Sequence, residues 1–144
     1  MKVIYMHDGH NLFDEFYSNF ASEWGVDESM ERNFQESKGT SIIVGIETSG
    51  IGVDPNGERV DELTPFANNT YGGGKGDLYL DFLINNVKPY VDEKFRTKTQ
   101  REFTGIMGSS LGGLFSFYAG LKHQNIFSKI GVFSPSFWFS KFKL

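Results

Sequence analysis

The residues with the clearest chemical potential form the segment Gly108-Ser109-Ser110-Leu111-Gly112-Gly113, which centres a Gly-x-Ser-x-Gly pattern on Ser110. An apolar run precedes this segment, and a sequence typical of a helix follows it. A strand that turns sharply into a helix crowds the backbone, so only glycine fits two residues before and after the serine. The turn exposes the hydroxyl, and the helix N-terminus favours negative charge beside it. The pattern predicts a nucleophilic Ser110, with the Leu111 amide directed at an oxyanion.

A plainer interpretation of the same segment is a glycine-rich helix start. In that case Ser109 or Ser110 would cap the first turn of the helix with its hydroxyl. Gly113 would serve in either interpretation, because it lets the helix pack closely on the sheet.

A second polar group, His7-Asp8-Gly9-His10-Asn11, follows the first apolar run. An acyl-transfer site needs a second backbone donor from the loop of a neighbouring strand, and Gly9 lets the chain turn there. The amide of His10 is therefore a candidate for an oxyanion hole. The alternative is an Asx-type turn formed by Asp8. The two histidines, with Asp14 nearby, could also suggest a metal site, but no firm third ligand supports it.

These groups need a scaffold, and the hydrophobic pattern predicts one of alternating strands and helices. Strands are expected over 2–6, 41–46, 102–107 and 129–134, and helices over 23–34, 77–95 and 111–121. Three of the apolar runs are nearly continuous, as in strands buried on both faces. The alternation predicts βαβ units and a mostly parallel sheet with helices on both faces. Active sites of such sheets lie at the carboxyl ends of the strands, where both polar groups fall.

The predicted helix over 77–95 contains Pro89, which is expected to kink it or to mark its last turns. Residues 48–76 are rich in Gly, Asn, Asp and Pro and are expected to form a long functional or mobile loop. The run Gly72-Gly73-Gly74-Lys75-Gly76 lacks the spacing of a phosphate-binding loop and reads better as a flexible loop. Trp24 is expected in the core.

Length and composition exclude several classes of protein. The 144 residues fit one domain, and 39% hydrophobic residues exclude disorder. The net charge of −4, without a basic cluster, argues against nucleic acid and anionic membranes as partners. The absence of cysteine excludes disulfides, a thiolate nucleophile and Cys-ligated zinc. No apolar run approaches the ~18 residues of a membrane span. Residues 1–6 do not suit a signal peptide, which favours a cytoplasmic location.

The chain resembles the putative esterase family of α/β-hydrolases, the group of esterase D and the enterochelin esterases that also includes feruloyl and acetyl-xylan esterases. Several ordered motifs together are more specific than the Gly-x-Ser-x-Gly pattern alone. They span nearly the whole chain and comprise Tyr5-Met6-His7-Asp8-Gly9, Arg59-Val60-Asp61-Glu62-Leu63-Thr64-Pro65, Lys88-Pro89-Tyr90-Val91-Asp92, the segment around Ser110, and Phe133-Ser134-Pro135-Ser136-Phe137-Trp138.

The resemblance implies a carboxylic ester hydrolase with an acyl-enzyme mechanism, on a three-layer α/β-hydrolase-type sheet that forms a single, incomplete domain over residues 1–144. Ser110 would match the nucleophile of the family, and the amides of Leu111 and His10 would match its oxyanion hole. No metal or organic cofactor is implied. The substrate would be a small-molecule or sugar-linked ester.

The resemblance also implies a substrate pocket beside the nucleophile. Ser136, Phe137 and Trp138, which come just after the last predicted strand, would line the pocket for the acyl or alcohol group. Trp138 could equally be a core residue, because indole serves both purposes.

The chain departs from the family pattern after the serine. No Asp or Glu follows Ser110, and the only later histidine is His123. This histidine lies at the end of the helix predicted after Ser110, which carries it too far away to act as the base. Family members continue to a strand with an acid and a loop with a histidine, and they have strands before residue 1. We therefore expect a fragment with weak or no turnover, whose exposed sheet edges favour self-association.

Two other classes of function remain open. A non-catalytic binding or scaffold protein could retain the serine turn without the triad, and the reactivity of Ser110 towards an activated phosphonate discriminates it. A hydrolase could use His7 or His10 as an improvised base, in which case replacing that histidine would abolish activity in a folded chain.

Overall fold

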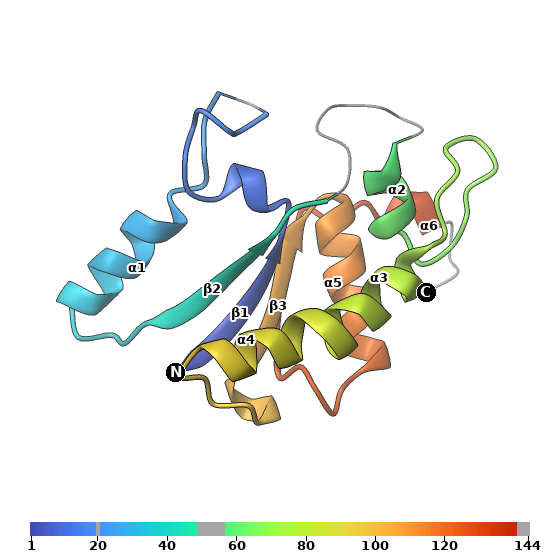
Figure 1. The fold of residues 1–144 in the computed structure, drawn as a ribbon. Helices are drawn as coiled ribbons and strands as arrows, with labels where there is room; N and C mark the ends of the chain where they lie inside the picture. Colours follow the sequence, from blue (N-terminus) through green and yellow to red (C-terminus); the bar gives the residue numbers. More distant parts are fainter. Residues whose placement is uncertain (20, 49–56, 141–144) are drawn as a thin grey trace.

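The computed structural model describes residues 1–19, 21–48 and 57–140, and a parallel sheet forms the centre of this part of the chain (Figure 1). Its strands are β1 (Lys2–His7), β2 (Ser41–Ile46), β3 (Thr104–Ser109) and β4 (Lys129–Phe133). They are hydrogen-bonded in the order β2-β1-β3-β4, and every pair is parallel. The predicted parallel sheet is confirmed, and all four strands end at the same edge.

Helices connect the strands and cover both faces of the sheet. They are α1 (Val26–Gln35), α2 (Glu58–Glu62), α3 (Gly76–Phe82), α4 (Lys88–Lys94), α5 (Leu111–Lys122) and α6 (Phe137–Ser140), with a π-helical segment η2 (Leu83–Val87) and 3₁₀ turns η1 (Gly9–Asn11) and η3 (Arg101–Phe103). No helix within the described ranges is long and apolar enough to cross a membrane.

The two faces of the sheet follow from the alternation of side chains along β1. Val3 and Tyr5 point into the main core, where they join residues of α3, α4 and α5 such as Leu114. Met6 and its neighbour Ile4 lie on the other face, in a smaller cluster with Val26 at the start of α1. The helices therefore form a layer on each side, as the sequence predicts.

The helical stretch before β3 is interrupted ahead of its proline. The segment η2 separates α3 from α4, and Pro89 occupies the first turn of α4. Proline cannot donate a hydrogen bond to the preceding turn and its ring crowds that turn, so the backbone widens there. Pro89 thus marks a change in helix type, and the last turns of the helix continue from it to Lys94; the expected kink stays a prediction.

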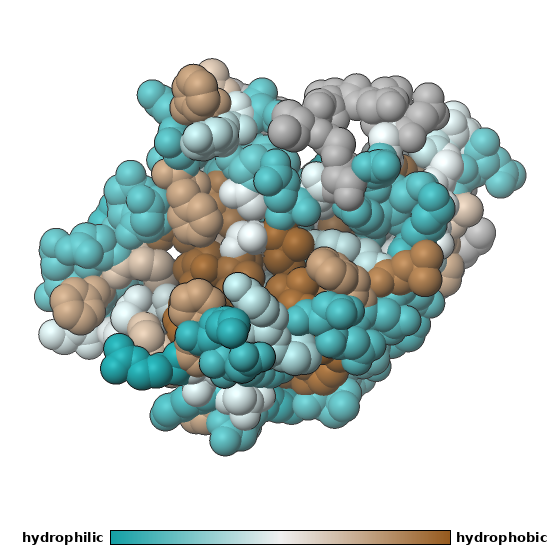
Figure 2. Space-filling model, viewed as in Figure 1, coloured by the Kyte–Doolittle hydropathy of each residue, from teal (hydrophilic) through white to brown (hydrophobic). Residues whose placement is uncertain are grey.

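The expectation that three strands are buried on both faces is wrong for β2 and β4, the two edges of the sheet. Side chains of β2 are mostly half-buried, and Phe133 at the end of β4 is 49% exposed. Figure 2 shows hydrophobic side chains gathered in the middle of one face, over β2 and β1. Ile42 and Val44 of β2 pack against the main core but are only partly buried.

Several element boundaries differ from the prediction. The third strand begins at Thr104, because η3 occupies the residues before it, and it continues to Ser109. The first helix begins at Val26, after Gly25 takes a left-handed conformation with φ 60°. The predicted loop over 48–76 contains the helix α2, and its residues 49–56 lie outside the described part of the chain.

One core prediction is also wrong. Trp24 is 41% exposed, and its ring packs against the edge of Phe133 at a centroid distance of 6.3 Å. The Phe133 side chain comes from the partly covered sheet edge, so the indole covers part of that edge instead of filling the main core.

Candidate active site

The turn that holds Ser110 joins β3 directly to α5. Strand β3 ends at Ser109 and α5 begins at Leu111, so a single residue makes the turn. Ser110 has φ 56° and ψ −118°, a backbone conformation that side-chain-bearing residues rarely adopt. Such a conformation costs on the order of 1–3 kcal/mol and persists where the surrounding structure enforces it. The exposed Ser110 side chain thus stands at the carboxyl edge of the sheet.

The glycines of the turn are required by close backbone contacts. A Cβ added to Gly108 would lie 2.7 Å from the carbonyl carbon of Gly112, and one added to Gly112 would lie 3.2 Å from Cβ of His7. Gly113 is equally constrained, since its Cβ would approach the Phe133 carbonyl oxygen to 2.9 Å. These distances give the steric reason for the glycines on both sides of Ser110. The absence of side chains at these positions lets the start of α5 pack closely on the ends of β1 and β4.

The hydroxyl of Ser110 does not cap α5. The helix has no side-chain cap, and Ser110 Oγ lies 3.0 Å from Oγ of Ser136. The backbones of the two turns are also joined, because the Ser110 amide donates to the Phe133 carbonyl and the Ser136 amide donates to the Ser110 carbonyl, both at 3.0 Å. For Ser110, the helix-cap interpretation is therefore wrong, and the hydroxyl is directed towards the segment after β4.

The segment after β1 lies beside this turn, because β1 and β3 are paired and parallel. A Cβ on Gly9 would lie 2.9 Å from the backbone of Gly45, so η1 packs directly on β2. Asp8 takes a left-handed conformation, and its carboxylate accepts two hydrogen bonds from Arg59, at 2.6 and 2.8 Å. This carboxylate does not form the Asx-type turn, because it is committed to Arg59 and, at 3.4 Å, to Thr48.

The bidentate pair with Arg59 links α2 to the end of β1. Asp8 is nearly buried, and the side chain of Arg59 is 28% exposed. A Cβ on Gly112 would lie 3.6 Å from the Asp8 carboxylate, so the pair lies next to the first turn of α5. Composition alone gives no signal for this pairing, since the two residues are 51 positions apart.

His7 is a core residue in this structure. It is 1% exposed, its Nδ1 lies 3.0 Å from the Tyr79 hydroxyl, and its ring packs edge-on against Phe115 at 4.9 Å. Burial lowers the pKa of His7 to about 4, and Asp8 offsets this only partly. The ring is therefore neutral at pH 7. Burial likewise raises the pKa of Tyr79, which keeps its hydroxyl protonated.

The histidines do not supply a base to Ser110 within the described residues. Nε2 of His7 is buried without a hydrogen-bond partner in this part of the chain, and Nε2 of His10 lies 2.9 Å from the side-chain nitrogen of Asn19. His123 caps the end of α5, about 20 Å along the helix from Ser110 at 1.5 Å per residue. Among the described residues, the histidines and acids that come close enough together to hold a metal are Glu23, Asp27 and Glu28, at and just before the start of α1, and they include neither His7 nor His10.

Exposed aromatic residues follow Ser136 on α6. Ser136 is buried, whereas Phe137 and Trp138 are exposed on α6, which excludes Trp138 from the core. Tyr71 packs edge-on against Trp138 with a centroid distance of 5.6 Å. Tyr71 was not predicted from the sequence, because it comes from the glycine-rich segment before α3.

That glycine-rich segment is packed against its neighbours. A Cβ on Gly73 would lie 2.2 Å from Oγ1 of Thr64, and one on Gly74 would lie 2.7 Å from the amide nitrogen of Ala67. The Asn68 side chain donates to the carbonyl of Phe139 at 3.1 Å, which holds the segment against α6. Gly73 and Gly74 therefore leave no room for a side chain, and the expectation of a flexible loop before α3 stays a prediction.

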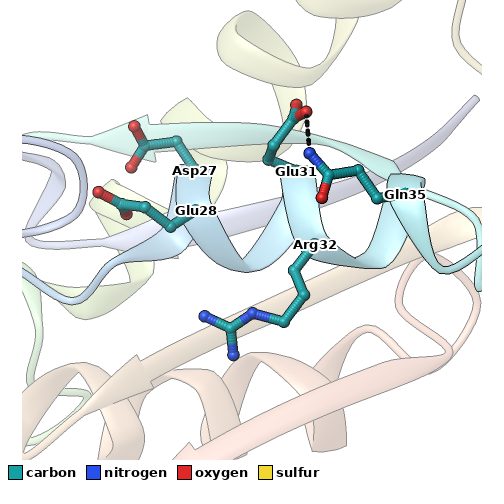
Figure 3. Close-up of a pocket in the computed structure, with 5 residues that line it drawn as sticks. All are labelled: Asp27, Glu28, Glu31, Arg32 and Gln35. Atoms are coloured by element: carbon teal, nitrogen blue, oxygen red, sulfur yellow. Dashed lines mark hydrogen bonds between the residues drawn. The ribbon is translucent and has the colours of Figure 1, made fainter.

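Two hollows lie beside α1, and the lining of the second includes Ser109 and Phe133, which adjoin Ser110. One, of about 500 Å³, is lined by exposed side chains of a single helix, α1, where Gln35 donates to Glu31 at 2.8 Å (Figure 3). Asp27 and Glu28 lie at its other end, and with Glu23 their carboxylates come within 4.8 Å of one another. Such exposed acidic groups are common without an ion. The other hollow, of about 530 Å³, is an apolar groove between the sheet and α1.

The parallel sheet, the helices on both faces and the strand–Ser110–helix turn define an α/β-hydrolase-type fold, of which the chain contains part. A comparison with known families matches residues 1–143 to the family described as Putative esterase. The chain belongs to this family.

Two known proteins support the assignment to this family and show how much of a relative's length the chain covers. The uncharacterized protein YbbA of Bacillus subtilis is 30% identical over 143 residues, which cover 95% of this chain and 50% of that protein. The siderophore triacetylfusarinine C esterase of Aspergillus fumigatus is 28% identical over 141 residues, covering 97% of this chain and 46% of that protein. The chain thus spans about half the length of the curated relatives it matches.

A solved structure has the same fold over nearly the whole of this chain. The BES protein of Bacillus cereus superposes with a TM-score of 0.75 at 23% identity, over 98% of this chain and 52% of that protein. The predictions of the family and of a partial α/β-hydrolase-type sheet are confirmed.

Proposed function

We propose that the chain acts on carboxylic esters through an acyl-enzyme formed on Ser110. The observation that carries this proposal is the backbone conformation of Ser110, a strained single-residue turn that presents its hydroxyl at the carboxyl edge of the sheet. Strain of this kind is concentrated at functional sites. Membership of the esterase family supports the same role.

In the proposed acylation, the Ser110 oxygen attacks the ester carbonyl carbon, and the alcohol leaves with a proton. Water then cleaves the acyl-enzyme and releases the acid. The Leu111 amide is the first of α5 and has no partner inside the helix, so it can donate to the carbonyl oxygen as that oxygen gains charge. We assign the second donor to the His10 amide in η1.

Turnover by this chain should be weak. A serine needs a base within hydrogen-bond reach, and the polar side-chain contact of Ser110 Oγ among the described residues is another hydroxyl. We therefore expect the chain to form the acyl-enzyme slowly and to hydrolyse it more slowly still.

The substrate proposed is a small-molecule ester with an aromatic or bulky acyl group. The related A. fumigatus protein is named for its action on a siderophore ester. Phe137 and Trp138 directly follow Ser136 and are exposed, and the exposed ring of Tyr71 packs against Trp138. Aromatic rings stack on such surfaces in offset or edge-on geometry, which favours planar acyl groups.

Covalent labelling tests the nucleophile. A fluorophosphonate should add to Ser110 in the folded chain, with formation of an oxygen–phosphorus bond and release of fluoride. Peptide mapping by mass spectrometry should place the adduct on Ser110, and Ser110→Ala should remove it. Ser109→Ala, which deletes the neighbouring hydroxyl, is the matched control and should be labelled like the parent chain. An unlabelled parent chain would support a non-catalytic binding protein instead.

A further inference from the structure

Among the described residues, the hydroxyl of Ser136 is within hydrogen-bond distance of the proposed nucleophile. The two Oγ atoms lie 3.0 Å apart, and Ser136 also donates its amide to the Ser110 carbonyl at 3.0 Å. Two hydrogen bonds therefore fix Ser136 relative to Ser110, one through the backbone and one through the side chains. The family resemblance gives Ser136 only a place in the wall of the substrate pocket.

The position of Ser136 is rigidly determined. Ser134, with φ 40°, and Pro135 form the tight turn that precedes it, and Phe139 donates its amide to the Ser136 carbonyl at 3.0 Å. A Cβ on Gly113 would lie 3.3 Å from Cα of Pro135, so this turn is also pressed against α5. A group held in this way does not have to reorganise as the neighbouring atom gains charge.

Burial decides the direction of the bond between the hydroxyls. Ser136 is 6% exposed, and within the described ranges its hydroxyl makes its side-chain hydrogen bond to Ser110 Oγ. A buried hydroxyl hydrogen needs an acceptor, and Ser110 Oγ is the acceptor that this part of the chain offers. Ser110 is exposed, so its own hydrogen can point to solvent or to a base. The burial of Ser136 therefore favours Ser136 as the donor and Ser110 as the acceptor.

We propose that Ser136 is a catalytic residue whose hydroxyl donates to the Ser110 oxygen and stabilises the negative charge that this oxygen gains as it loses its proton. Hydrogen bonds to an ionised oxygen are shorter and about twice as strong as neutral ones. The bond therefore strengthens when the proton of Ser110 leaves for solvent or for a base, and it makes the oxygen available for attack. This role rests on the proposed function of Ser110.

The rate of fluorophosphonate labelling measures this contribution directly in the full chain. Removing a donor to a developing charge should slow labelling of Ser136→Ala by about tenfold to a hundredfold. Ser136→Cys keeps the shape of the side chain and a weak S–H donor, so its labelling rate should lie between those of the parent chain and Ser136→Ala. Ser134→Ala removes an exposed hydroxyl from the same turn and should label at the rate of the parent chain.

The pH dependence separates this role from a structural one. Because the donor favours the deprotonated oxygen, its loss should move the rise of the labelling rate to higher pH. A damaged turn would lower the rate by the same factor at every pH. Circular dichroism confirms that each variant is folded, and Ser136→Cys carries the test if Ser136→Ala does not fold.

The outcomes are distinct. A slower Ser136→Ala with a shifted pH profile supports the proposal. Labelling of Ser136→Ala at the parent rate, or a fall that is uniform in pH, overturns it and leaves the role of Ser110 intact. A parent chain that is never labelled overturns the nucleophile itself, and the role of Ser136 with it.

Discussion

Protonation of His7 should destabilise the folded chain in mild acid. The imidazole is 1% exposed among Tyr79 and Phe115, and burial lowers its pKa from 6.5 to about 4. Between these two values the unfolded chain binds a proton that the folded chain does not. Stability is therefore fully present above pH 6.5 and is lost as the pH falls towards 4.

The magnitude follows from the size of the pKa difference. One pKa unit corresponds to about 1.4 kcal/mol, so the full difference is worth about 3 kcal/mol. This is a large share of the roughly 5–15 kcal/mol that holds a typical domain together. The unfolding free energy should therefore fall steeply between pH 6.5 and pH 4.

Carboxylates also titrate in this range, so the test compares two chains. His7→Gln keeps a side-chain amide that can bond to the Tyr79 hydroxyl but does not titrate. Urea unfolding of both chains is measured at intervals from pH 7.5 to pH 4. The unfolding free energy of the parent minus that of His7→Gln should fall by about 3 kcal/mol over this range. His123→Gln, the same exchange at the partly exposed end of α5, is the matched control. If the difference between parent and His7→Gln does not change with pH, His7 is not a buried neutral group and the described core is incorrect.

Three further substitutions test the scaffold of the site by urea unfolding. Gly108→Ala should lose about 1–3 kcal/mol of stability, because its Cβ would lie 2.7 Å from the backbone of α5; an unchanged midpoint would contradict the described turn. Arg59→Met leaves the buried carboxylate of Asp8 without its cationic partner, so the chain should lose about 1–3 kcal/mol of stability. The double variant Asp8→Asn, Arg59→Met should recover part of this loss, because it also removes the buried charge. Leu114→Ala should lose about 2–5 kcal/mol, whereas the control Leu121→Ala on the exposed side of α5 should lose little; equal losses would contradict the packing of the helix.

The sequence predicts the sheet and the serine turn because both depend on local patterns. Short apolar runs alternate with helical ones, and glycines flank Ser110 at the spacing that a one-residue turn requires. The structure explains this spacing, because a Cβ on Gly108 would clash with the backbone of Gly112. Pro89 likewise predicts the interruption of a helix from its own covalent structure.

The remaining features depend on contacts between distant residues, which a single sequence does not reveal. The pairing of Asp8 with Arg59 spans 51 positions, and the approach of Ser136 to Ser110 spans 26. Trp24 looks like a core residue by its type, yet it lies over a partly covered sheet edge. Tyr71 gave no signal because its partner, Trp138, follows a strand at the other end of the described chain.

Reaction with p-nitrophenyl acetate shows directly whether Ser110 is a nucleophile that accepts an acyl group. The parent chain and Ser110→Ala are compared at equal concentration, with release of p-nitrophenol followed by absorbance and the chain analysed by intact mass. We expect slow release that depends on Ser110, together with an acetyl group on Ser110 that persists because the described residues place no base beside it. Equal release from both chains, with no acetylated Ser110, would contradict this expectation.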